Sequence, residues 1–192
     1  MNSFYAFLSR MKYINRWALM RNTQADTLSQ HSHEVAAISY ALAVIGNRRL
    51  GADYNAERAC LLGLFHDMPE ILTGDMPTPV KYFNPQIRSA YDEVEKSACD
   101  RLLEGLPQDL RPDFFPLFVK NDEDAPLWRL VKAADKLSAL IKCVEERENG
   151  NRDFVDAERS TMEIIKNLHC EEAEIFISEF MDAFELSLDE LT

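Results

Sequence analysis

The sequence has little cysteine, few basic residues and no long apolar run, and each shortage excludes a class of protein. The four cysteines are widely spaced and form no C-x-x-C pair, which excludes a zinc finger or a disulfide framework and is typical of reduced core thiols. Lys and Arg number 21 against 33 Asp and Glu, and the resulting net charge of -12 repels nucleic acids and anionic membranes. Because no apolar stretch is long enough to cross a bilayer, we expect a soluble cytoplasmic protein with no membrane or nucleic-acid partner.

A pattern of alternating polar and apolar residues is also missing, so no stretch favours a β-sheet. Apolar residues instead recur at helical spacing, and a chain of 192 residues that is 46% hydrophobic and 28% charged suffices for one domain with a sizeable core. We therefore predict an all-α helical bundle in a single domain over residues 1–192. The expected helices are 3–15, 30–45, 55–65, 84–103, 127–146, 154–168 and 173–184.

Polar and helix-breaking residues mark where some of these helices begin and end. Ser29 and Asn55 precede apolar stripes and are favourable N-caps. Asp67 is placed to cap a further short helix, which Gly74 is expected to end. Prolines and acidic residues interrupt the stretch 106–126, which indicates loops around a short helix.

The stretch Phe65-His66-Asp67-Met68-Pro69-Glu70 carries the strongest chemical signal. An apolar helix ends there in an imidazole and two carboxylates. Burying such groups is costly unless they are paired, and a divalent cation is the simplest partner. A purely structural interpretation stays open, with Asp67 as a helix cap and His66 as a hydrogen-bonded core histidine.

Two more candidate ligands come from other predicted helices. The apolar stripe of the second helix extends back to His31, whereas His33 lies about 200° around the helix and is expected to face solvent. Asp135 lies at the margin of the apolar face of the helix 127–146. Pairing with Lys132 or Lys136 is the structural alternative for Asp135.

Together these residues suit a metal-dependent hydrolase. Two imidazoles and two carboxylates, from His31, His66, Asp67 and Asp135, favour a borderline divalent metal such as Mn, Co, Fe or Zn over Ca. Four protein ligands on such an ion leave positions for water and for a phosphate oxygen. Glu70, one turn beyond Asp67, is a candidate to hold the water or move its proton.

Arg16 and the loop after Gly74 are candidates for contacting a phosphate-bearing substrate. A guanidinium neutralises phosphate as a bidentate fork, although the usual fate of an isolated arginine is a surface charge, and that of Trp17 a core anchor. The segment Thr73–Phe83 holds prolines and a glycine, which predict a rigid loop without regular structure. It follows the expected metal site directly, so it suits a wall of a substrate site or serves only as a connector.

These residues resemble a known family. His31, then His66-Asp67, then Asp135 match, in order and in helical context, the H…HD…D signature of the HD-domain metal-dependent phosphohydrolases. Further segments resemble the bacterial YfbR-type 5'-deoxynucleotidases, and the resemblance covers nearly the whole chain. The segments are 14–17, 29–32, 66–70, 73–83 and 186–190.

The resemblance implies a single HD-type helical bundle that hydrolyses 2'-deoxyribonucleoside 5'-monophosphates to deoxynucleoside and phosphate. It also implies a cytoplasmic homodimer with one divalent metal ion per site, such as Co, Mn or Zn. Carried over by position, Glu70 acts as the catalytic carboxylate through water, Arg16 orients the phosphate and Trp17 lines the nucleotide site. The implied metal ligands are His31, His66, Asp67 and Asp135, of which Asp67 and Asp135 also lie against the phosphate. The implied sugar contacts, which favour 2'-deoxyribose, are Asp75, Met76, Pro77 and Thr78.

Two alternative functions and one departure from the family's sequence pattern remain. An HD phosphohydrolase can act on a cyclic nucleotide, a triphosphate or an alarmone, although a triphosphate wants more cations than Arg16, Lys81 and Lys132 supply. A non-catalytic nucleotide-binding helical module is the other alternative, and the intact ligand set with Glu70 disfavours it. Gln30 stands where relatives often have Glu, and we expect its effect to stay away from the metal.

Overall fold

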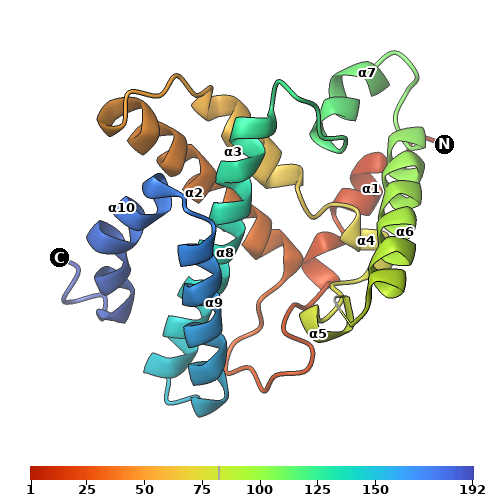
Figure 1. The fold of residues 1–192 in the computed structure, drawn as a ribbon. Helices are drawn as coiled ribbons and strands as arrows, with labels where there is room; N and C mark the ends of the chain where they lie inside the picture. Colours follow the sequence, from red (N-terminus) through yellow and green to blue (C-terminus); the bar gives the residue numbers. More distant parts are fainter. Residues whose placement is uncertain (82) are drawn as a thin grey trace.

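The computed structural model describes residues 1–81 and 83–192, and its regular structure is helical. Within those residues no strand forms, and only an isolated antiparallel bridge joins Asn15 to Thr27. The predicted all-α fold is therefore confirmed (Figure 1). The α-helices and short 3-10 helices (η) are α1 (Phe4–Leu8), η1 (Met11–Tyr13), α2 (Leu28–Arg49), α3 (Ala56–Phe65), α4 (Glu70–Thr73), α5 (Thr78–Lys81), α6 (Pro85–Glu104), α7 (Arg111–Phe114), η2 (Phe115–Leu117), α8 (Ala125–Glu148), η3 (Arg152–Phe154), α9 (Val155–Asn167), α10 (Glu171–Phe180) and η4 (Met181–Glu185).

Three helices form the centre of the molecule. Helix α2 packs against α3 and α8, and α3 also packs against α8. Their facing residues are fully buried, among them Val35 and Leu42 of α2, Leu62 of α3, and Leu130 and Leu137 of α8. The seven-residue spacing within α2 and within α8 repeats after two helical turns, so each pair lies on one face. Burying one such side chain stabilises the fold by about 1.5–3 kcal/mol, and the packing fixes the three helices relative to one another.

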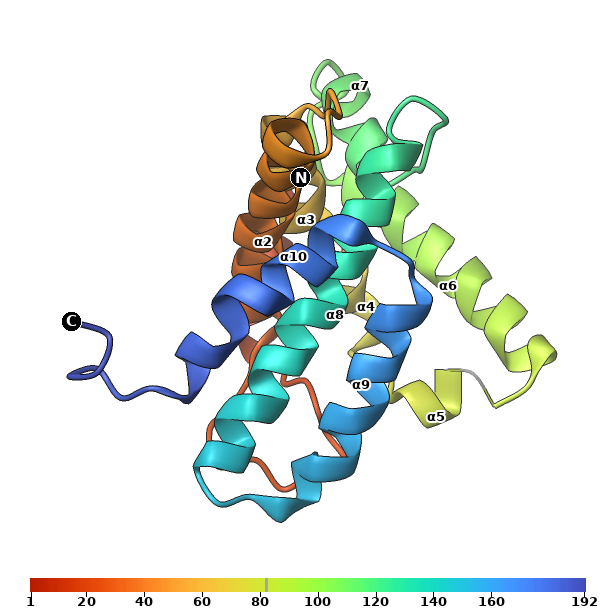
Figure 2. The ribbon, with the colours of Figure 1, turned by 60° about the vertical axis from the view of Figure 1, so that its left-hand side comes forward.

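The remaining helices surround this centre. Helix α9 packs on α8, and α10 packs on α2 and α8, while α4 and α5 pack against α6 on the other side of the molecule (Figure 2). The segment that follows α3 is thereby held between the central helices and α6. None of the helices in the described part of the chain is long and apolar enough to span a bilayer.

The predicted N-terminal helix 3–15 is broken into two pieces. Helix α1 ends at Leu8, and η1 begins at Met11 after a turn. The Ser9 hydroxyl donates to the Ala6 carbonyl at 3.1 Å, a local bond by which serine competes with continued helix. Phe4 and Met11 are nevertheless both buried, so the apolar stripe reaches the core through the break.

Helix α2 starts two residues earlier than predicted, because Thr27 and not Ser29 is its N-cap. The Thr27 hydroxyl accepts from the Gln30 backbone N–H at 3.4 Å, and the Gln30 side chain accepts from the Thr27 N–H at 2.9 Å. This is a capping box, in which Glu and Gln both serve. Gln30 is thus part of the cap of α2. Asn55 caps α3 as predicted, accepting from the Arg58 N–H at 2.9 Å.

Asp67 is not a helix cap, which corrects the expectation from the sequence. Helix α4 begins at Glu70 after Pro69, without a side-chain cap, and ends at Thr73. Gly74 is its C-cap, and a φ of 75° suits glycine. The Asp67 backbone carbonyl accepts from the Glu70 N–H at 3.0 Å, so the main chain makes the turn and the carboxylate stays available.

The segment expected to be a loop without regular structure contains the one-turn helix α5. The Pro77 carbonyl accepts from the N–H groups of Val80 and Lys81 at 2.8 and 3.0 Å. Proline is tolerated in a first helical turn because its missing N–H would be unpaired there, and this explains why Pro79 does not prevent α5. Tyr82, which belongs to the same expected wall, lies outside the described residues.

Candidate active site

His66 and Asp67 project from the end of α3. The His66 Nδ1 atom lies 2.7 Å from the Gly63 carbonyl oxygen, an acceptor only, so Nδ1 carries the proton of the neutral ring. The lone pair of Nε2 is therefore available to bind a metal. This atom lies 2.9 Å from an Asp67 carboxylate oxygen. The backbone at the end of α3 sets the orientation of the imidazole.

His31 reaches the same place from the first turn of α2 and is fully buried. Its Nδ1 atom lies 2.9 Å from the Ser138 hydroxyl oxygen, and that hydroxyl donates to a Glu34 carboxylate oxygen at 2.8 Å. Because the single hydroxyl proton goes to Glu34, Ser138 accepts from His31 and Nδ1 carries the proton. The His31 Nε2 atom then faces Asp67 and Asp135, at 3.4 and 3.3 Å from their nearest carboxylate oxygens.

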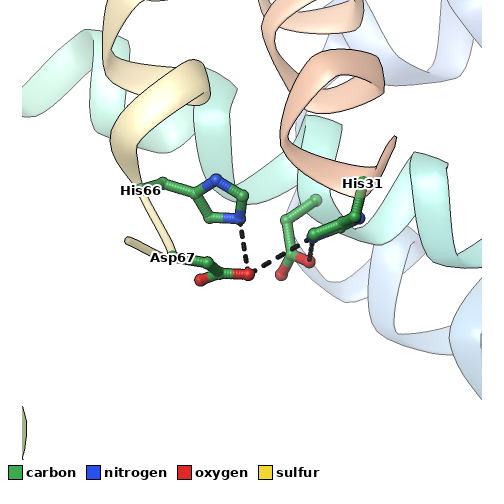
Figure 3. A group of neighbouring side chains, drawn as sticks. His31, His66 and Asp67 are labelled. Atoms are coloured by element: carbon green, nitrogen blue, oxygen red, sulfur yellow. Dashed lines mark ion pairs between the residues drawn. The ribbon is translucent and has the colours of Figure 1, made fainter. Parts of the chain in front are cut away.

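The four side chains converge on one point from three segments of the chain. One ligand atom from each of His31, His66, Asp67 and Asp135 lies within 4.8 Å of the others. Figure 3 shows how His31, His66 and Asp67 point toward one another. Both Nε2 atoms are buried, and neither makes a hydrogen bond of acceptable geometry. A buried polar group without a partner costs about 1–3 kcal/mol, so the cluster fits a divalent cation that takes two nitrogen and two oxygen ligands.

The two aspartates of the cluster are held in the anionic form. Burial alone raises the pKa of Asp67, but the imidazoles of His66 and His31 outweigh it and hold this pKa well below its ordinary value. Burial likewise raises the pKa of Asp135, but the nearby His31 imidazole and the charge of Lys136 outweigh it and lower this pKa overall. The Lys136 ammonium lies 2.9 Å from one Asp135 oxygen while the other oxygen faces His31. The lysine pair and the candidate ligand role thus use different oxygens.

The pKa of Glu70 is shifted in the opposite direction to those of Asp67 and Asp135. It is only 8% exposed, and its Oε2 atom has no hydrogen-bond partner. Burial, followed by the charges of Asp67 and Asp75, raises its pKa to about 9, against the lowering effects of Lys81 and Arg16. Carboxylates whose surroundings push their pKa values apart divide roles, so Asp67 suits a cation ligand and Glu70 a group that holds and releases a proton.

Arg16 and Trp17 are held together by Asp26 across the loop between η1 and α2. The Arg16 Nη1 atom and the Trp17 Nε1 atom both donate to Asp26 Oδ2, at 2.7 and 3.1 Å. The bridge between Asn15 and Thr27 closes the loop behind them. Burial lowers the pKa of the Arg16 guanidinium, but surrounding carboxylates outweigh it and raise this pKa. These are, in decreasing order, Asp26, Asp135, Asp67 and Asp75.

The Trp17 backbone is strained. Its φ of 59° lies in the left-handed region, which costs an L-residue about 1–2 kcal/mol. The Trp17 carbonyl accepts from the Met20 N–H at 2.9 Å and from the Asn22 side chain at 3.3 Å. The indole packs on the Phe154 ring with the centroids 5.3 Å apart. These contacts keep the turn that brings the two consecutive side chains to one carboxylate.

Asp75 joins the loop after α4 to this segment. Burial raises the pKa of Asp75, while the Arg16 charge and a hydrogen bond from the Trp17 backbone act to lower it. Of the other predicted sugar-side residues, Met76 and Pro77 are half-buried and Thr78 is exposed. Among the residues that the structure describes, no hydrogen bond or ion pair joins those three to the four candidate ligands.

Sequence reasoning missed several residues that orient the site. Ser138 lies one turn after Asp135 on α8, a spacing that offered a signal, but its partner Glu34 comes from α2. The Gly63 carbonyl that orients His66 is a backbone group and leaves no trace in composition. Asp26 lies ten residues from Arg16 in an irregular loop, where spacing carries no information.

The helical fold around this cluster of two histidines and two aspartates is the fold of the HD-domain phosphohydrolases. An HD-domain phosphohydrolase from Listeria innocua superimposes with a TM-score of 0.81 at 22% identity, over 95% of this chain and 88% of that one. A cyanophage S-2L HD phosphohydrolase, bound to dA and one catalytic Zn2+ ion, gives a TM-score of 0.68 at 18% identity, over 93% and 96% of the two chains. At these identities the likeness establishes the fold.

The chain belongs to the YfbR-like 5'-deoxynucleotidase family, whose model matches residues 3–184. A 5'-deoxynucleotidase from Vibrio cholerae is 44% identical over 189 residues, which cover 98% of this chain and 97% of that relative. The predicted family and the predicted class of enzyme, a phosphoric monoester hydrolase of the 5'-deoxynucleotidase type, are thereby confirmed.

Proposed function

We propose that the protein hydrolyses 2'-deoxyribonucleoside 5'-monophosphates to a deoxynucleoside and inorganic phosphate. The observation that carries the proposal is one cluster of four candidate metal ligands beside a buried carboxyl group and a guanidinium that is only 11% exposed. Metal ligands, a proton-transfer group and a phosphate-binding cation are the three parts that hydrolysis of a phosphate monoester requires. The full-length relative named a 5'-deoxynucleotidase supports the choice of substrate.

The proposed metal ligands are His31, His66, Asp67 and Asp135, and the ion is a divalent transition metal such as Co, Mn or Zn. When bound, such an ion polarises the phosphoryl group and lowers the pKa of water. The hydrogen bonds at both Nδ1 atoms support this assignment, since they leave both Nε2 lone pairs for the cation.

The proposed role of Glu70 is proton transfer. As a carboxylate it accepts a proton from the attacking water at Oε2, and as an acid it returns that proton to the 5'-oxygen when the phosphorus–oxygen bond breaks. Its raised pKa supports the acid half of this cycle, and a nearby cation favours the carboxylate needed for the base half. Asp67 and Asp135 lie against the phosphate in this proposal and keep their charges throughout.

Arg16 and Trp17 are proposed to bind opposite ends of the nucleotide. Of the guanidinium nitrogens of Arg16, Nη1 is the one that donates to Asp26, and the electrostatic effect of the cluster carboxylates on Arg16 supports a position next to the phosphate. Trp17 lines the side of the site toward the base. Asp75, with Met76, Pro77 and Thr78, forms the sugar side and favours 2'-deoxyribose.

We also infer that the enzyme works as a homodimer in the cytoplasm with no nucleic-acid or membrane partner. The family resemblance supports the assembly, and the four cysteines, all free in the described chain, support a reducing compartment. Sedimentation equilibrium of the purified protein measures the assembly directly, and a monomer at micromolar concentration contradicts it.

The deciding experiment measures phosphate release from matched deoxyribo- and ribonucleoside 5'-monophosphates. Protein stripped of metal is refilled separately with Co, Mn, Mg or Zn. We expect turnover of deoxy substrates only, and only with a metal. Replacing Glu70 by Ala abolishes turnover while the metal stays bound. Turnover of a cyclic nucleotide, a triphosphate or an alarmone in place of the monophosphates refutes the proposed substrate.

A further inference from the structure

Asp26 is the one described side chain to which both Arg16 and Trp17 donate hydrogen bonds. The two donors meet at a single oxygen, Oδ2, and the carboxylate is only 13% exposed. The main chain adds a second link, because the Arg16 N–H donates to the Asp26 carbonyl at 2.9 Å. A displacement of the Asp26 carboxylate therefore moves a guanidinium and an indole together.

The loop that carries Asp26 is itself fixed to α8 by a buried ion pair. Glu146, which is 1% exposed, accepts from the backbone N–H groups of Thr23 and Gln24 at distances of 2.9 to 3.3 Å. Lys142 pairs with Glu146 and also donates to the Gln24 carbonyl at 2.8 Å. Figure 2 shows this loop beside the C-terminal part of α8. The position of Asp26 is thus set by the same helix that carries Asp135.

We propose that Asp26 is the positioning residue that makes Arg16 and Trp17 one recognition unit, so that phosphate binding and nucleoside binding depend on each other through its carboxylate. The proposal rests on the proposed function, in which those two side chains contact the substrate. Asp26 acts only through its neighbours: Arg16 uses one nitrogen for Asp26 and keeps its other edge for the phosphate.

The strained Trp17 backbone supports a positioning role over mere stabilisation of the loop. A relaxed tryptophan would avoid a φ of 59°, and this conformation is what lets the indole N–H and the preceding guanidinium reach the same oxygen. Asp75 of the loop after α4 also interacts with this segment, because the Arg16 charge and the Trp17 backbone both act to lower its pKa. Two carboxylates, those of Asp26 and Asp75, thus interact with this segment.

The test compares Asp26→Asn with Asp153→Asn. Asp153 is a matched control, because it pairs with Arg21 of the same loop through two hydrogen bonds of 2.8 and 2.9 Å but lies outside the recognition unit. The variants are made in a Trp128→Phe background, which leaves Trp17 as the only tryptophan. The Trp128 N–H has no hydrogen-bond partner, so this background change removes no hydrogen bond. Circular dichroism checks that each variant is folded.

For Asp26→Asn we expect KM for the deoxynucleotide to rise by about 10-fold to 100-fold, with a smaller change in kcat. Trp17 emission should shift to the red and become more accessible to acrylamide. Asp153→Asn should change neither. The combination of Asp26→Asn with Arg16→Ala should lower kcat/KM no further than Arg16→Ala alone, because both changes remove one unit.

Unchanged Trp17 emission in folded Asp26→Asn overturns the proposal, and so do effects of Asp26→Asn and Arg16→Ala that multiply. Equal effects of Asp26→Asn and Asp153→Asn also overturn it, since the loop as a whole would then be responsible. If the unmodified enzyme releases no phosphate from deoxynucleotides, the proposed function fails. The emission and quenching measurements need no turnover and still decide whether Asp26 positions Trp17.

Discussion

Replacing Glu70 by Gln should stabilise the metal-free protein at pH 8, although it removes the proposed proton-transfer group. Glu70 is buried, its Oε2 atom has no partner, and its pKa is raised from the ordinary 4.5 to about 9, first by burial and then by Asp67 and Asp75. The folded state therefore binds the proton more tightly than the unfolded chain. Stability from this group is complete below pH 4.5 and is lost as the pH rises toward 9.

The size of the effect follows from the difference in pKa. Each pH unit between the two pKa values costs about 1.4 kcal/mol, which between pH 5 and pH 8 amounts to a ceiling of about 4 kcal/mol. Gln has the shape of the protonated carboxyl group and does not ionise. We expect the advantage of Glu70→Gln over the unmodified protein to grow by about 2–4 kcal/mol from pH 5 to pH 8.

Urea unfolding followed by circular dichroism, with chelator present, measures this difference. Glu172→Gln is the control, because Glu172 is also buried but its carboxylate accepts two hydrogen bonds from Arg129, at 2.7 and 3.0 Å. Burial alone raises the pKa of Glu172, and the Arg129 bonds outweigh it and lower this pKa to about 2. The control should lose about 1.5–3 kcal/mol at both pH values. A Glu70→Gln advantage that is the same at pH 5 and pH 8 refutes the reasoning.

The remaining predictions concern the metal site and the loop beside it. Ser138→Ala leaves the buried His31 Nδ1–H without an acceptor and should weaken metal binding, measured by calorimetry, about 10-fold to 100-fold. Ser160→Ala removes an exposed hydroxyl and should leave metal binding unchanged. Equal affinities of the two variants would contradict the role of Ser138. A metal added at 100 times its Kd should stabilise the stripped protein by about 2.7 kcal/mol in urea unfolding. His66→Ala removes a candidate ligand and should abolish this stabilisation. Gly74→Ala places a side chain at a φ of 75° and should lower the free energy of unfolding by about 1 kcal/mol or more. Thr78→Ala, at an exposed position, should change it little. An unchanged free energy of unfolding in Gly74→Ala would show that the turn adapts.

Local sequence information determined the long helices and the family. The apolar stripes of α2, α3 and α8 follow from periodicity, because a helix returns to the same face after two turns regardless of its neighbours. His31 lies on the stripe of α2 and is fully buried, as that pattern indicates. The spacing from His31 through His66-Asp67 to Asp135, with the flanking segments, was sufficient to identify the family that the comparisons confirm.

Capping and loop structure were less predictable, because near-equivalent residues compete over one or two positions. Thr27 and Ser29 are both good N-caps, and the capping box with Gln30 decides between them. Asp67 has the chemistry of a cap, yet the backbone makes that turn and leaves the carboxylate to the cluster.

The tertiary structure alone decided which groups orient the site. His31 meets Ser138 across 107 positions of sequence, and Glu146 holds Thr23 across 123. Such contacts depend on the packing of α8 against α2 and on the path of the irregular loop around Asp26. The types of residue able to bind a metal and move a proton can be recognised in the sequence. Their tautomers, charges and partners are not, because each is set by a neighbour that is distant along the chain.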